Sequence, residues 1–189
     1  MKNTLKKNGK NASFHYPNRQ IILDVQGGTK LLSLLKNDFW GRSMADVTSH
    51  KSYRPLTVFT YRLNRLFFGA GPFSFHLVNV LLHAWLVNRF FWFVRYLGLD
   101  SAHSFLTVIL FGLHPVNSES VANCVGRAEI LSAHFFLSAI KSRDDSVLSG
   151  AFAFLSMLCK EGGVFSLALL VGIEVALLLR SFRFGFDIF

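Results

Sequence analysis

Two short polar stretches, just ahead of the apolar half of the chain, hold residue types that bind anions. The stretch NDFWG at residues 37–41 supplies a carboxylate, and SHKSYRPL at residues 49–56 supplies a His, a Lys and an Arg. An Arg side chain offers a planar fork to phosphate oxygens, and a Lys offers a mobile point charge. With similar groups further along the chain, the candidates for binding an anion are His50, Lys51, Arg54, His114, Arg127 and Lys160.

The composition places these groups at the edge of a membrane. The chain has 189 residues, of which 51% are hydrophobic and only 16% are charged, and it contains 21 Phe and carries a formal net charge of +9. From Leu56 onward, long apolar runs are broken only by short charged joints. This pattern is typical of a polytopic membrane protein with basic residues in its loops, so we expect an all-α membrane helical bundle.

Three regions follow from this pattern. Residues 1–23 form a basic tail that we expect to be disordered, and the tail is not a signal peptide because no apolar run follows its lysines. Residues 24–55 form a polar loop segment, which we expect on the lumenal side. Residues 56–189 form the transmembrane helical region.

About five spans can be drawn in this region, at residues 75–97, 103–115, 128–140, 146–159 and 163–179. The first is the clearest, because it is long enough to cross a bilayer and has aromatic residues near one end. The three middle segments are short, and runs of their length also fit re-entrant or buried helices. Glu174 interrupts the last span, and we interpret it as structural because it lies toward the cytosolic end.

The charges in the loops predict how the spans are oriented. If the five segments alternate, one side of the membrane receives Arg89, Arg95, Lys141, Arg143, Arg180 and Arg183. The positive-inside rule makes that side cytosolic. The lumenal side then holds four cations against the rule, namely Lys51, Arg54, Arg127 and Lys160. One such cation is explained by contact with lipid head groups, but four beside carboxylates and histidines favour a bound anion.

Several candidates also have a structural interpretation, and both interpretations stay open from sequence alone. Arg54 precedes a proline that fixes the backbone, and it is either a site residue or a head-group anchor. Asp38 is either a functional carboxylate or the cap of a helix that begins at Phe39. His114 and Arg127 are either helix caps or residues that face one lumenal hollow.

Four blocks of sequence resemble one known family. In order they are NDFWG…SHKSYRPLTVFTYRLN, FHLVNVLLHAWL, FGLHPVNSESVANCVGRAEILS and LCKEGG. These blocks, at this spacing, resemble the transmembrane and tetratricopeptide-repeat-containing O-mannosyltransferases, and the similarity extends from Asp24 to Arg180. The resemblance implies a multi-pass protein of the endoplasmic reticulum membrane with part of the glycosyltransferase type C fold.

The resemblance also implies a reaction: mannose passes from dolichyl phosphate mannose to Ser or Thr hydroxyls of secretory-pathway proteins, with cadherin domains among the acceptors. We expect no cofactor, no metal and no nucleic-acid partner. Such a transfer needs a carboxylate to remove the hydroxyl proton, and cations to hold the departing phosphate. The candidate carboxylates are Asp38, Glu119, Glu129 and Glu161, and of these we predict Asp38 and Glu119 to be catalytic.

The sequence departs from the family pattern at both ends. A lysine-rich tail stands where family members have a first span followed by a lumenal acidic pair, the usual position of the base in this fold. Neither the later spans nor the helical repeats of the family follow residue 189, so we expect a truncated or alternatively spliced member.

These departures give a second hypothesis beside the enzyme. The chain is then a non-catalytic membrane scaffold, or a regulator that binds the lipid phosphate. A transporter fits less well because no half of the chain is repeated and no charges pair at mid-span. A nucleic-acid binder fits least, since the cations are scattered among the spans.

Overall fold

The computed structural model describes residues 33–69 and 71–186. The predicted tail, residues 1–23, and the first part of the predicted loop, residues 24–32, lie outside the described residues. Within them the fold is all-helical, as predicted. The elements are α2 (Ser33–Lys36), α3 (Pro55–Phe68), α4 (Pro72–Tyr96), α5 (Ser101–Gly112), α6 (Pro115–Ala122), η1 (Cys124–Gly126), α7 (Arg127–Lys141), α8 (Ser146–Cys159), η2 (Glu161–Gly163) and α9 (Val164–Phe186), where η marks a 3₁₀ turn.

Local sequence signals explain where these helices begin. Helices α3, α4 and α6 each have a proline in the first turn, where a missing N–H costs no intrahelical hydrogen bond. Asp100 caps α5 and Asp145 caps α8, each carboxylate accepting two backbone N–H groups of the first turn. Gly69 and Gly98, with φ of 76° and 95°, follow the ends of α3 and α4.

All five predicted spans are helices, but their lengths differ. Helix α4 has 25 residues, or about 37 Å at the usual rise per residue, and it is the one helix among the described residues that is long and apolar enough to cross a membrane. Helices α5 and α8 are apolar but have 12 and 14 residues, about 18 and 21 Å, against about 30 Å of hydrocarbon core. More than one crossing therefore stays a prediction.

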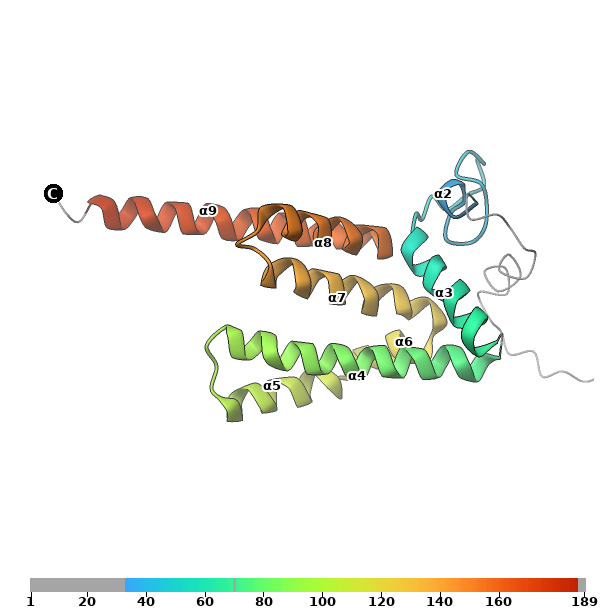
Figure 1. The fold of residues 1–189 in the computed structure, drawn as a ribbon, viewed down its shortest axis with the longest axis horizontal. Coiled ribbons are helices and arrows are strands. Elements are labelled where there is room, and N and C mark those ends of the chain that lie inside the picture. Colours follow the sequence, from blue (N-terminus) through green and yellow to red (C-terminus); the bar gives the residue numbers. More distant parts are fainter. Residues whose placement is uncertain (1–32, 70, 187–189) are drawn as a thin grey trace, which may run out of the picture.

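The long helices lie roughly side by side, as Figure 1 shows. Helices α4 and α5 form one layer and α7, α8 and α9 form the other, with α7 packed between α4 and α8. Helix α3 crosses one end of both layers, and α9 extends beyond its neighbours at the other end. Helix α7 is the most enclosed, since eight of its residues are buried.

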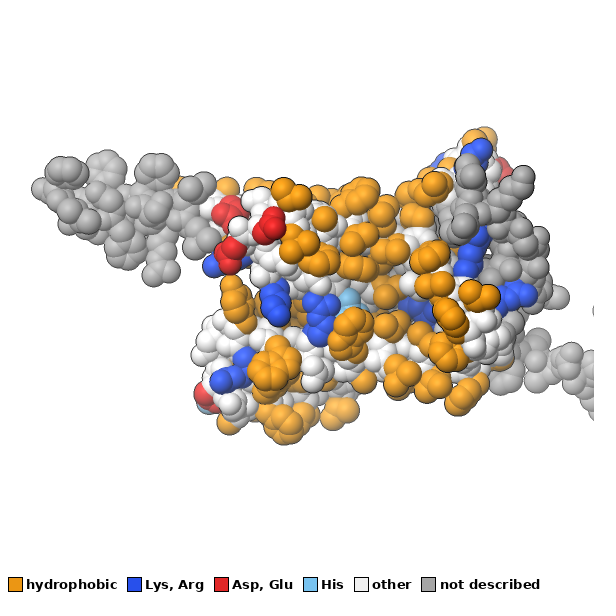
Figure 2. Space-filling model, in the orientation of Figure 1, with side chains coloured by type: hydrophobic (Ala, Val, Ile, Leu, Met, Phe, Trp, Pro, Cys, Tyr) orange, Lys and Arg blue, Asp and Glu red, His pale blue; other side chains and the backbone are white. Residues whose placement is uncertain are grey.

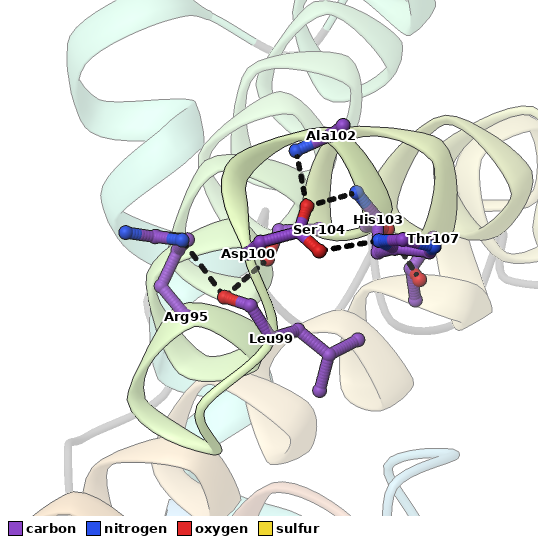
Figure 3. A network of polar contacts seen from close by, with 7 residues as sticks. All are labelled: Arg95, Leu99, Asp100, Ala102, His103, Ser104 and Thr107. Carbon is purple, nitrogen blue, oxygen red and sulfur yellow. Dashed lines mark hydrogen bonds and ion pairs between the residues drawn. The ribbon is translucent and has the colours of Figure 1, made fainter.

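The two ends of the bundle carry different polar groups. At one end, the loop of residues 37–54 contacts η1 through Phe39 and η2 through Arg54, and α6 lies beside η1 and the start of α7; we call this the charged end. At the opposite end lie the short turns that join α4 to α5 and α7 to α8. Figure 3 shows the first of these turns, where Asp100 accepts the N–H groups of Ala102 and His103 and also contacts the His103 ring. Arg95 in turn donates to the carbonyl oxygen of Leu99.

The interior of the bundle mixes apolar and polar side chains, and its exterior is largely apolar. The largest fully buried side chains are Arg127, Phe39, Asn79, Thr57, Cys159, Ser104, Ser156 and Ser166. Large apolar side chains are exposed on α3, α4, α5, α8 and α9, among them Phe67, Trp92, Leu110, Phe154 and Val171. Figure 2 shows hydrophobic side chains spread over one face of the molecule. Small and polar residues between helices, with apolar residues outside, are the pattern of helical membrane proteins.

Two glycines allow neighbouring backbones to touch. A Cβ atom at Gly126 would lie 2.2 Å from the backbone oxygen of Ser120, and one at Gly163 would lie 2.4 Å from the backbone carbon of Ser156. No side chain fits at either position. Helix α6 is thereby held against the start of α7, and η2 against the end of α8.

Candidate functional site

An ion pair joins the end of α8 to the first turn of α7 at the charged end. The ammonium of Lys160 lies 2.6 Å from Glu129 Oε1, and Ser120 Oγ donates to Glu129 Oε2 at 2.8 Å. Both partners are reachable from outside, since their side chains are 33% and 51% exposed. The carboxylate of Glu129 therefore faces a cation and a hydroxyl while remaining open to a ligand.

A second ion pair lies beside the first. Arg54 donates from Nε to both carboxylate oxygens of Glu161, at 3.1 and 2.9 Å, and its Nη2 lies 2.7 Å from Oε2. The guanidinium also packs over the Phe39 ring, 5.0 Å from the ring centroid. Burial raises the pKa of Glu161, but hydrogen bonds from Arg54 and from backbone groups outweigh it and hold the pKa below its ordinary value.

The sequence explains why the two pairs are neighbours. Lys160 and Glu161 are consecutive residues at the junction of α8 and η2, so one short turn supplies a partner to each pair. Arg54 comes immediately before Pro55, the first residue of α3, which sets its backbone position. Chemically, this arrangement offers two cations to an anion and two carboxylates that can accept a proton.

Asp38 is buried in the loop of residues 37–54, and donors occupy both of its carboxylate oxygens. Oδ1 accepts the N–H groups of Trp40 and Arg42 at 3.0 and 2.8 Å, and Oδ2 accepts Ser49 Oγ at 2.6 Å. The interpretation of Asp38 as the cap of a helix at Phe39 is wrong, because the chain forms a turn there rather than a helix. The carboxylate organises the loop.

His50 and Lys51 lie in the same loop. His50 is exposed and packs against the Trp40 ring, with the ring centroids 6.1 Å apart. Lys51 bends back over the loop, and its ammonium donates to the carbonyl oxygens of Met44 and Asp46 at 2.5 and 2.8 Å. Lys51 also has a positive φ of 58°. Its ammonium is therefore hydrogen-bonded within the loop, to neither carboxylate of the two ion pairs.

His114 and Glu119 belong to α6. His114 caps this helix, since its Nδ1 accepts the backbone N–H of Val116 at 3.2 Å, as the capping interpretation of the sequence requires. Glu119 is exposed on the same helix. It lies one residue before Ser120, which binds Glu129, so α6 borders the first ion pair.

Arg127 does not face an open hollow, because it is fully buried between three helices. Its Nε donates to Asn79 Oδ1 at 2.7 Å, and its Nη2 donates to Asn64 Oδ1 and to the carbonyl oxygen of Phe75, at 2.9 and 3.0 Å. The guanidinium lies over the Tyr61 and Phe75 rings, 4.7 and 5.5 Å from their centroids. Burial lowers the pKa of Arg127. Its helix, α7, is thus fixed to α3 and α4.

The structure thus brings together two of the six predicted anion ligands, Arg54 and Lys160, and assigns contacts within the fold to the other four. Their partners Glu129 and Glu161 are carboxylates that the sequence suggested without placing them in the site. Ser120 was not suggested at all. Separations of 31 residues between Glu129 and Lys160, and 107 between Arg54 and Glu161, leave no local signal for these pairings.

The described residues form an all-helical bundle with polar side chains in its interior, an apolar exterior, ion pairs at one end and one helix long and apolar enough to cross a membrane. Comparison with curated proteins then gives the family. The protein O-mannosyl-transferase TMTC3 of Homo sapiens is 42% identical over 153 residues, which cover 75% of this chain. TMTC1 of Mus musculus is 45% identical over 130 residues, 67% of this chain. Tmtc1 of Drosophila melanogaster is 40% identical over 174 residues, 84% of this chain.

The chain belongs to this family of protein O-mannosyl-transferases, and the predicted resemblance is confirmed. It spans a small part of these relatives, since the alignments cover 17%, 14% and 20% of their respective lengths. No protein-family model matches the chain. No solved structure matches it either.

Proposed function

We propose that this chain is the membrane-embedded, donor-binding part of a protein O-mannosyltransferase of the endoplasmic reticulum. The donor is dolichyl phosphate mannose, and the acceptors are Ser or Thr hydroxyls of secretory-pathway proteins, with cadherin domains as candidates. In the transfer, the bond between mannose C1 and the phosphate oxygen breaks and a bond from C1 to the hydroxyl oxygen forms. The hydroxyl proton goes to a carboxylate, and the phosphate leaves on the lipid.

The observation that carries this proposal is the pair of neighbouring ion pairs at the charged end. Arg54 and Lys160 come from different helices and converge through Glu161 and Glu129. A phosphate that approaches them can replace the carboxylates as the partner of both cations. The carboxylates so released are then free to accept the proton of an incoming hydroxyl.

The outer surface of the bundle supports the placement in a membrane. Large apolar side chains are exposed on five of the helices, and α4 is long enough to cross. A polyprenyl tail would lie along this surface while its phosphate meets the charged end. We propose several further crossings by the shorter helices, tilted or lengthened by their flanking residues, with the charged end on the lumenal side.

The predicted bases Asp38 and Glu119 remain part of the proposal with less support than Glu129 and Glu161. Both oxygens of Asp38 already accept hydrogen bonds within its loop, so a role as base requires that loop to open. Glu119 is exposed and close in sequence to Ser120, which reaches the first ion pair.

The test measures donor binding and turnover separately. The chain is purified in lipid nanodiscs, and binding of dolichyl phosphate mannose is followed by native mass spectrometry, with transfer of labelled mannose to a Ser/Thr peptide assayed in parallel. Arg54→Met and Lys160→Met should each weaken donor binding, whereas the control Lys36→Met, which removes an exposed cation of α2 outside both ion pairs, should not. Unchanged binding in both site variants would remove the charged end from the proposal.

A non-catalytic role is the second candidate, and one observation favours it. Arg54 and Lys160 each already have a carboxylate within hydrogen-bonding distance, so in this state Glu161 and Glu129 are both engaged by cations. A scaffold or regulator of this kind would bind the lipid phosphate without transferring mannose. Measurable turnover by the purified chain would eliminate it.

A further inference from the structure

A second group of cations lies along the seam between α4 and α7, away from the charged end. On α4, residues 85, 89 and 92 share one face because they are four and three positions apart, and they are Trp85, Arg89 and Trp92. On α7 the same spacing places His134, Ser138 and Lys141 on one face. Figure 2 shows basic side chains and a histidine in a row between these two helices.

Arg89 bridges the seam. Its Nη1 donates to the carbonyl oxygen of His134 at 2.9 Å, and its Nη2 donates to Ser138 Oγ at 2.7 Å. The guanidinium lies 5.8 Å from the Trp85 ring centroid, and the Trp85 ring packs on His134 at 4.4 Å. The Arg89 head group is therefore held in one position at the surface of the seam.

The seam carries positive charge without a matching carboxylate. Among residues 33–69 and 71–186, no Asp or Glu is ion-paired with Arg89 or with the exposed Lys141. The acidic residues nearest in sequence are otherwise engaged: Asp145 caps α8, and Asp144 lies 3.7 Å from Arg143. A guanidinium with five N–H donors keeps capacity for an anion after its three contacts with α7, to the carbonyl oxygen and Nδ1 of His134 and to Ser138 Oγ.

Aromatic and apolar surface borders these cations. Trp85 and Trp92 are 56% and 64% exposed, and Leu81, one turn before Trp85, is also exposed. Trp side chains are enriched at the level of lipid head groups, with apolar residues deeper in the bilayer. Arg89 is seven residues before the end of α4, about 10 Å along the helix, a depth that a long basic side chain spans to reach a phosphate.

We propose that this seam binds one anionic phospholipid, with its phosphate held by Arg89 and Lys141 and an acyl chain lying over Leu81 and Trp85. The charge of the seam selects the occupant, since the site offers donors to an anion and apolar surface to a chain. The inference rests on the membrane placement proposed above, but it concerns a different end of the bundle from the donor site.

The experiment compares lipids at fixed protein. The chain is purified in nanodiscs of phosphatidylcholine with a minor share of phosphatidylglycerol, and the lipid that stays bound after transfer to detergent is identified by native mass spectrometry. The parent chain should retain phosphatidylglycerol in preference to phosphatidylcholine. Lys141→Gln should reduce that retention about fivefold, as expected for one cation at a lipid surface.

Controls separate lipid binding from folding. Lys141 is exposed, so Lys141→Gln leaves the helix packing intact, whereas Arg89→Gln also removes contacts between α4 and α7. Lys36→Gln, which removes an exposed cation of α2 outside both proposed sites, should retain phosphatidylglycerol like the parent. Equal retention of the two lipids by the parent, or full retention by Lys141→Gln, would overturn the proposal.

The outcome also distinguishes this inference from the proposed function. If alkaline carbonate extracts the chain from membranes, the chain is not embedded in the bilayer, and both proposals are overturned. If the chain resists extraction but shows no preference for phosphatidylglycerol, only the proposal of a lipid site at the seam is overturned. If the chain retains phosphatidylglycerol but does not bind the donor, the lipid site at the seam is supported and the donor site at the charged end is contradicted.

Discussion

Lys160 and Glu129 form a 2.6 Å hydrogen-bonded ion pair, although 31 residues separate them in the chain. This contact ties the end of α8 to the first turn of α7, and it places a mobile cation beside a carboxylate that is also bound by Ser120. Glu161, the residue that follows Lys160, engages Arg54. The charged end is therefore assembled by long-range contacts rather than by one contiguous motif.

The Lys160–Glu129 pair should contribute little to stability. Both side chains are partly exposed, and exposed ion pairs are worth about 0.2–1 kcal/mol. A double-mutant cycle with Lys160→Met and Glu129→Gln, read by thermal unfolding in detergent, should give a coupling within that range. A coupling above about 2 kcal/mol would show that the pair is structural, and any loss of donor binding in Lys160→Met would then be secondary to unfolding.

The Arg54–Glu161 pair should make stability fall in acid. The folded-state pKa of Glu161 is below its ordinary value, so the stabilisation is fully present above the unfolded-state pKa of about 4.3 and is lost as pH falls through the folded value. Because Glu161 is about half exposed, the loss should not exceed about 1 kcal/mol. Urea unfolding across this range should show a shallower acid loss in Glu161→Gln than in the parent; parallel curves would contradict the prediction.

Replacing Arg127 should destabilise the bundle strongly. Arg127→Met leaves the amide oxygens of Asn64 and Asn79 buried without their donor, at about 1–3 kcal/mol each. Arg127→Lys should be nearly as destabilised, because one ammonium does not reproduce a fork that spans both amides. Thermal unfolding of the two variants measures this, and a Met variant as stable as the parent would refute the structural role of Arg127.

Gly163→Ala should destabilise the chain, although alanine is usually the better helix former. The added Cβ would lie 2.4 Å from the backbone of Ser156, and overpacking of this kind costs about 1–3 kcal/mol. The matched control is Gly150→Ala in α8, where no atom lies within 4 Å of the added Cβ, and it should gain up to about 1 kcal/mol. The same sign for both changes in unfolding experiments would contradict the close packing at η2.

Helix positions were predictable because their signals are local. The predicted segment of residues 146–159 coincides with α8, whose start is fixed by the cap Asp145, and the segment of residues 128–140 falls within α7. Proline marks the start of α3, yet this helix lies outside all five predicted spans because Arg62, Asn64 and Arg65 interrupt its apolar residues. A local sequence pattern identifies a helix of mainly apolar residues well, and a helix that combines apolar and charged residues poorly.

The candidate site was only partly predictable. The topology of charges singled out Arg54 and Lys160 as well as Arg127, but it did not separate a cation at the surface from one enclosed between helices. That difference depends on Tyr61 and Phe75, which come from two other helices and surround the Arg127 guanidinium. The residue types can be read from the sequence, but tertiary packing determines which of these side chains remain accessible to a ligand.

Lys160 and Glu161 are adjacent, and their bonds run to α7 and to the start of α3. A ligand that pulls this short turn outward must loosen both bonds at once, since the two residues share one piece of backbone. Displacement of this turn would therefore release Arg54 and Lys160 from their carboxylates together.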